Sequence, residues 1–70
     1  MRNLKYVVYR EGDYFVSQCL NTDISSFGES IDEAVKNLKD AVELYLRDDP
    51  ENIVFNNVGD ALIGEAVING

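Results

Sequence analysis

FGESIDEAVKNLKDAVELYL, residues 27–46, decides the fold of this 70-residue chain. Ser30 and Glu33 have the spacing of a capping box, in which the serine hydroxyl and the glutamate side chain satisfy free N–H groups at the start of a helix. Pro50 disfavours helical geometry at the residue before it, so we expect the helix to end there. Between these signals, apolar residues recur every three or four positions and form one stripe. The stripe consists of Ile31, Ala34, Val35, Leu38, Ala41, Val42, Tyr45 and Leu46.

The rest of the chain is rich in β-forming residues. Runs at residues 3–10 and 13–20 flank a glycine-containing turn and predict a hairpin, and a short third strand is expected over residues 25–28. Residues 61–68 predict a final strand, although Gly64 interrupts the pattern and leaves a disordered or partner-ordered tail as the alternative. The predicted fold is α+β: a small antiparallel-type sheet of three to four strands, with one long amphipathic helix on one face. We expect a single domain over residues 1–70.

Such a sheet has two faces, and a single helix covers only one of them. Strict alternation places apolar side chains on both faces of the predicted hairpin. The face without the helix should therefore be an apolar patch that binds a protein or a second copy of the chain, unless the tail folds over it or its residues are simply half exposed. The candidate interface residues are Val7, Tyr9 and Tyr14, with Glu29, Asp32 and Leu44 as further candidates.

Composition narrows the functional classes. Thirteen acidic and six basic residues give a net charge of −7, which disfavours direct binding to nucleic acid and suits a basic protein partner. There is no histidine, and Cys19 has no second cysteine to pair with, so histidine-dependent catalysis and an intrachain disulfide are excluded. We expect a cytoplasmic protein without a cofactor, a membrane helix or enzymatic activity. The enzymatic alternative is a metal-dependent nuclease built on Asp48, Asp49 and Glu51, but a solvated charge cluster at a helix end explains these residues more simply.

Residues 6–46 resemble the HicB family of antitoxins. The resemblance is carried by the acidic-glycine turn followed by Asp13-Tyr14-Phe15-Val16, by a glycine, serine, glutamate and alanine at the helix start, and by the runs at residues 37–41 and 44–46. The helix-start residues are Gly28, Ser30, Glu33 and Ala34. The resemblance implies a truncated ribonuclease-H-like fold.

The same resemblance implies an inhibitor. A HicB domain binds HicA, a small basic toxin with a double-stranded-RNA-binding-like fold that cleaves mRNA through a histidine, and covers its active site. The expected partners are accordingly a basic HicA-like toxin and further copies of the chain, as a homodimer or higher homo-oligomer. Many family members continue into a DNA-binding domain, for which this chain has no room, so binding to operator DNA is not expected. The alternative is an orphan HicB-fold oligomer with another regulatory or scaffolding partner.

Overall fold

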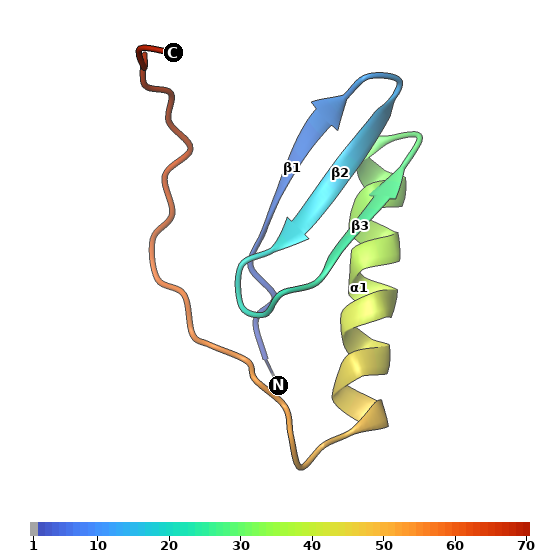
Figure 1. Cartoon of the computed structure of the whole chain (residues 1–70). Coiled ribbons are helices and arrows are strands. Elements are labelled where there is room, and N and C mark those ends of the chain that lie inside the picture. The colour runs from blue at the N-terminus through green and yellow to red at the C-terminus, as the bar shows by residue number, and fades with distance from the viewer. Residues whose placement is uncertain (1) are drawn as a thin grey trace.

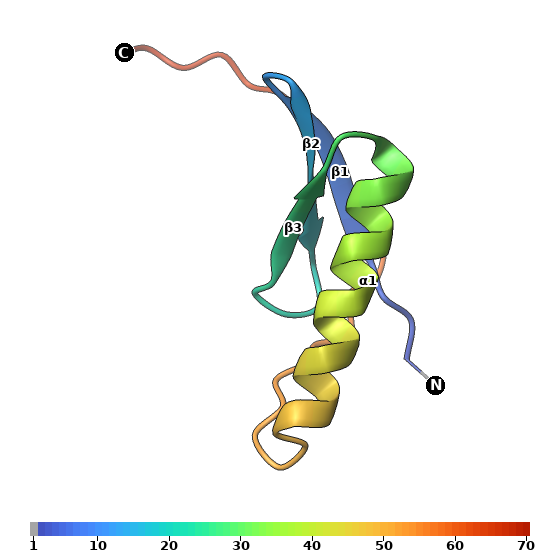
Figure 2. The same cartoon turned by 90° about the vertical axis from the view of Figure 1, so that its right-hand side faces the viewer.

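The computed structural model describes residues 2–70. Three strands, β1 (Tyr6–Glu11), β2 (Tyr14–Cys19) and β3 (Ser25–Gly28), precede one helix, α1 (Ile31–Asp48). The strands form an antiparallel sheet in the order β1-β2-β3. Helix α1 covers one face of this sheet and runs along β3 and β2 (Figure 1; Figure 2). The predicted α+β arrangement is confirmed, as are the third strand and the start of the helix at Ile31. Within the described residues, no helix has the length and apolar character needed to cross a bilayer.

A two-residue turn joins β1 to β2. Glu11 pairs with Tyr14, and Gly12 between them has a φ of +61°. Asp13 has a negative φ, so only the first turn position lies in the region that favours glycine. Glycine at the first position is typical of the hairpin turns that match the twist of the flanking strands. The turn therefore fixes the register of the hairpin.

The start of α1 is capped as the sequence predicts, with one difference. Ser30 is extended, and its Oγ accepts a hydrogen bond from the Glu33 N–H at 3.1 Å. Glu33 Oε1 accepts from the Glu29 N–H at 2.9 Å instead of from the N–H of Ser30 itself. The glutamate thus ties the residue before the cap to the first turn, which holds the link between β3 and α1 rigid.

Small side chains determine which sheet face receives the helix. Ser17 is completely buried, and its Oγ donates to the Ala34 carbonyl at 2.7 Å. At Gly28, a Cβ atom would lie 2.6 Å from the Ala34 backbone nitrogen. These two residues let the helix backbone approach closely, and the stripe residues Leu38 and Val42 then pack with Cys19 to form the core.

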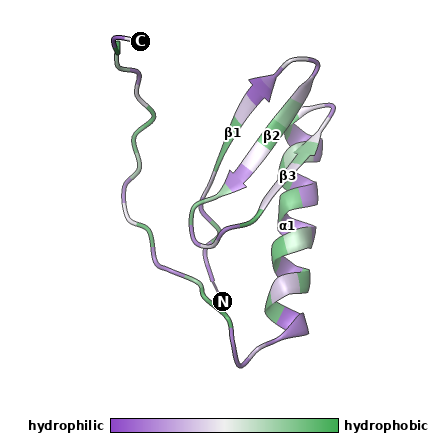
Figure 3. Ribbon diagram, in the orientation of Figure 1, coloured by the Kyte–Doolittle hydropathy of each residue, from purple (hydrophilic) through white to green (hydrophobic). Residues whose placement is uncertain are grey.

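The prediction of a strand over residues 61–68 is wrong for the single chain. Residues 53–70, here called the C-terminal segment, contain no regular secondary structure. The segment packs its first residues against the body, where the Asn56 N–H donates to the Asn21 carbonyl at 2.8 Å, and it then leaves the sheet (Figure 1). Several of its later residues are nevertheless hydrophobic (Figure 3). High β propensity is insufficient for a strand, because a strand exists only where its backbone groups find a partner.

Candidate functional site

Among the described residues, no helix or strand covers the sheet face opposite α1. Ser17, Cys19 and Gly28 point toward the helix, so the residues between them point the other way. This surface, here called the open face, consists of Val7, Tyr9, Tyr14, Val16 and Phe27 together with the polar residues Glu11, Gln18 and Ser25. The side chains of Tyr9 and Phe27 are 50% and 65% exposed. The apolar patch expected on the uncovered face is therefore present.

One cross-strand row organises the open face. Val16 in β2 lies directly between Tyr9 in β1 and Phe27 in β3. Tyr14 packs its ring edge against Phe27, with the ring centroids 5.6 Å apart at an angle of 64°. The row places one aromatic ring on each side of a β-branched residue, and cross-strand neighbours of this kind stabilise a sheet. The open face thus presents aromatic side chains side by side to solvent.

An acidic hollow adjoins the open face where the hairpin turn meets the helix start. Its volume is about 400 Å³. It is lined by Asp13, Tyr14, Phe27, Gly28, Glu29 and Glu33. The Glu33 carboxylate accepts a hydrogen bond from the Glu29 N–H. The carboxylates of Asp13 and Glu29 are exposed and accept no hydrogen bond from another described residue. Two carboxylates beside a pair of aromatic rings form a site that suits a lysine or arginine side chain.

The structure brings together some of the predicted interface residues and separates others. Val7, Tyr9 and Tyr14 share the open face, and Glu29 lies in the adjoining hollow. Leu44 is 56% exposed on α1, which covers the other side of the sheet, and so it belongs to a different surface. Asp32 is exposed in the first turn of α1, where its charge suits the positive end of the helix.

Sequence reasoning missed Val16 and Phe27 as interface residues. Alternation along the hairpin already places Val16 beside Tyr14 on one face. Phe27 could not be placed in the same way, because a four-residue strand gives too little alternation to fix its register. Only the pairing of Val16 with Phe27 shows that β3 contributes to the open face.

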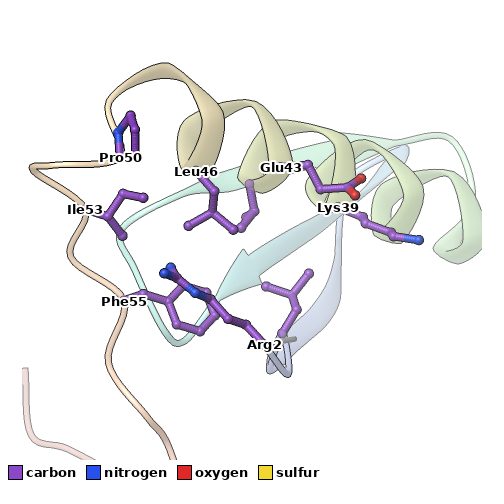
Figure 4. A pocket seen from close by; sticks show the side chains of 9 residues that line it. Arg2, Lys39, Glu43, Leu46, Pro50, Ile53 and Phe55 are labelled. Carbon is purple, nitrogen blue, oxygen red and sulfur yellow. The ribbon is translucent and has the colours of Figure 1, made fainter.

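A second cavity lies on the helix side, between the end of α1 and the N-terminal residues. Its volume is about 490 Å³, and Figure 4 shows side chains from α1, from the segment after it and from the N-terminus around it. Leu46, Ile53 and Phe55 contribute apolar surface, and the Arg2 guanidinium lies 5.2 Å from the Phe55 ring centroid. Lys39 and Glu43 of α1 also line this cavity, so one basic and one acidic side chain stand at its rim beside the apolar residues.

The acidic residues at the end of α1, considered above as a possible metal site, form a hydrogen-bonded turn after the helix. Asn52 Nδ2 donates to both carboxylate oxygens of Asp49, at 3.2 and 3.0 Å. Within residues 2–70, no three acidic or cysteine side chains are grouped so that they could hold a metal ion. Cys19 is buried in the core beside Leu38.

Neither a protein-family model, nor a curated protein, nor a solved structure matches this chain. The resemblance to HicB antitoxins therefore stays a prediction from the quoted motifs. Several of these motif residues have a local structural role: Gly28 permits the close approach of α1, Ser30 caps it, and Ala34 is fully buried beneath β2. These motif residues therefore join α1 to the short strand β3 and pack it against the sheet.

Proposed function

We propose that this chain is an antitoxin-like protein-binding module that neutralises a HicA-type mRNA-cleaving toxin by covering the toxin's RNA-binding surface. The observation that carries the proposal is the open face: exposed aromatic rings held in a fixed row on a chain with a net charge of −7. Large apolar patches of this kind on small proteins usually mark an interface.

The aromatic row provides the anchors that a protein interface needs. Interface energy is concentrated in a few residues, most often aromatic or arginine, near the centre of the contact. Phe27 and Tyr9 lie at the two ends of the row, and Tyr14 supports Phe27 from the side. Because neighbouring strands already position these rings, little side-chain entropy is lost when they are buried. The open face is therefore suited to binding with few anchor residues.

The acidic hollow provides charge complementarity. A surface that binds RNA is rich in lysine and arginine, because it must attract phosphates. The same basic side chains would meet Asp13 and Glu29 at the edge of the open face, next to the Tyr14 ring. Opposite charges at the rim accelerate association and select the basic partner over acidic proteins. An inhibitor that competes with RNA in this way requires no catalytic group of its own.

The test measures inhibition and binding together. The partner to test is a small basic HicA-type toxin, with cleavage of a labelled RNA as the activity and titration calorimetry as the binding measurement. We expect the wild-type chain to stop RNA cleavage when about one molecule of the chain is present for each molecule of toxin. Phe27→Ala should weaken binding by about 2 kcal/mol, roughly 30-fold in Kd, because it removes an anchor at the end of the row.

A matched variant separates the two surfaces of the molecule. Leu44→Ala also removes an exposed apolar side chain, but from the helix side, and should leave Kd within about 2-fold. Glu29→Lys should lower the association rate and reduce its dependence on salt. The proposal is wrong if the chain leaves RNA cleavage unchanged at saturating concentration, or if Phe27→Ala inhibits as well as the wild type while Leu44→Ala does not.

The alternative function is a homo-oligomer that serves another regulatory or scaffolding partner. It is favoured by the exposed apolar residues of the C-terminal segment, Leu62, Ile63, Val67 and Ile68. The cleavage assay distinguishes this alternative, because an orphan oligomer would leave the toxin active.

A further inference from the structure

Residues 60–70 are apolar but uncovered. Leu62 is 93% exposed and Val67 is fully exposed, and Ile63 and Ile68 are nearly as open to solvent. Within the described chain, residues 60–70 make no hydrogen bond. The backbone groups of this segment can bond to water, but such a concentration of exposed aliphatic side chains is unfavourable in water, and it indicates a segment that is covered in the functional state.

The sheet has one long open edge, which β1 provides. The Leu20 N–H donates to the Lys5 carbonyl at 2.9 Å, so the backbone groups of Lys5 point toward β2. Because these groups alternate along a strand, the N–H and C=O groups of Tyr6, Val8 and Arg10 point outward from β1. No other strand lies beside them. Unpaired edges of this kind are templates for an additional strand.

The opposite edge, β3, is a poor alternative. It is only four residues long, and α1 packs along it. Asn37 Nδ2 donates to the Phe27 carbonyl at 2.8 Å, which engages one of its edge groups. A short edge that is partly satisfied by a helix side chain is protected against strand addition. The vacant position is therefore the edge of β1.

Residues 61–68, ALIGEAVI, have the composition and charge for this position. Apart from Gly64 and Glu65 the run is entirely aliphatic, and its eight residues are enough to span the six residues of β1. Three of the six basic residues of the chain lie in or just before β1, at Arg2, Lys5 and Arg10, whereas no basic residue follows Arg47. Lys5 Nζ already contacts the Gly59 carbonyl. Charge complementarity thus favours pairing of this segment with β1.

The course of the segment points to a β1 on another molecule. After the contact with Lys5 it diverges from its own β1, and both views show its end far from the sheet (Figure 1; Figure 2). In extended form, residues 60–70 reach roughly 36 Å. This reach exceeds the roughly 20 Å length of a six-residue strand such as β1, so the segment is long enough to pair with one on a neighbouring molecule.

We propose that residues 61–68 add as a strand to the free edge of β1 in a second copy of this chain. In a two-fold arrangement each copy gives one strand and receives one, so both free edges and both apolar segments are covered together. The exchange extends each sheet sideways and leaves the open face unoccupied. It is independent of the antitoxin proposal and can be tested without any toxin.

The first experiment measures mass by light scattering over a range of chain concentrations. Strand exchange predicts a particle of 15.8 kDa, twice the 7.9 kDa of one chain. In the double variant Ile63→Asp/Val67→Asp, two charges would enter the new strand, and the mass should fall to that of one chain. The matched control Leu44→Asp/Val54→Asp also replaces two exposed apolar residues outside residues 61–68, and should keep the mass of two chains.

Circular dichroism shows whether each variant is folded. Both variants should keep the signal of α1, because Ile63 and Val67 are exposed in the single chain, and the double variant should lose only the β contribution of residues 61–68. Isotope-filtered nuclear Overhauser spectra of mixed labelled and unlabelled chains then identify the edge that is used. Contacts between residues 61–68 and β1 of different chains are expected. The proposal is overturned by a wild-type monomer at every concentration, by a dimer that survives the double Asp variant, or by contacts found only within one chain.

Discussion

Gly28 is the position at which the fold is most sensitive to a single added atom. Its ideal Cβ would lie 2.6 Å from the Ala34 nitrogen and 2.9 Å from two atoms of Glu33. Two of these three atoms belong to the backbone of the first helical turn, which cannot move without disturbing the cap. Gly28→Ala should therefore push α1 away from β3 and loosen the burial of Ala34.

The expected loss in unfolding free energy follows from the crowding of the added methyl group against the first turn of α1. Adding a methyl group to a tightly packed site typically costs about 1–3 kcal/mol, and a clash with backbone belongs near the upper end. A domain of 70 residues has a total unfolding free energy of roughly 4–10 kcal/mol. With a urea m-value of about 1 kcal/mol per molar, a loss of about 2–3 kcal/mol lowers the unfolding midpoint by about 2–3 M.

Urea titration followed by far-ultraviolet circular dichroism measures this shift. Gly59→Ala is the matched control, because a Cβ at that position meets no atom within 4 Å and the residue lies outside residues 61–68. It should leave the free energy of unfolding within about 0.5 kcal/mol of the wild type. A Gly28→Ala midpoint indistinguishable from that of Gly59→Ala would refute the close approach of β3 and α1.

Two further predictions concern the core and the anchor of the C-terminal segment. Leu38→Ala should lower the free energy of unfolding by about 2–5 kcal/mol in the same urea titration, because Leu38 is completely buried between α1 and the sheet; a loss below 1 kcal/mol would contradict that placement. Asn21 is buried; its Oδ1 accepts from the Lys5 N–H at 2.7 Å and its Nδ2 donates to the Asn56 carbonyl at 2.8 Å. Asn21→Ala should cost about 1–3 kcal/mol and accelerate amide hydrogen exchange at Lys5 and Asn56; unchanged exchange at both amides would show that Asn21 does not join the two segments.

The locally encoded elements could be predicted from the sequence because their signals lie within a few residues of one another. The cap at Ser30, the stripe that contains Leu38 and Val42, and the turn at Gly12 all occur where the pattern places them. The presence of an uncovered apolar face was predictable too, since one helix cannot cover two faces. Three of the candidate interface residues, Val7, Tyr9 and Tyr14, lie together on that face for the same reason.

The sequence by itself determined one helix, one hairpin and a sheet with two apolar faces. Only the tertiary structure decided which face of the sheet the helix covers, because both faces satisfy the alternation of apolar residues. The choice depends on contact distance. Ser17 and Gly28 are small enough for the Ala34 backbone to approach, whereas Val16 and Phe27 on the other face are too large. Tertiary structure also decided the state of residues 61–68, since a strand requires a partner edge that no local pattern can supply.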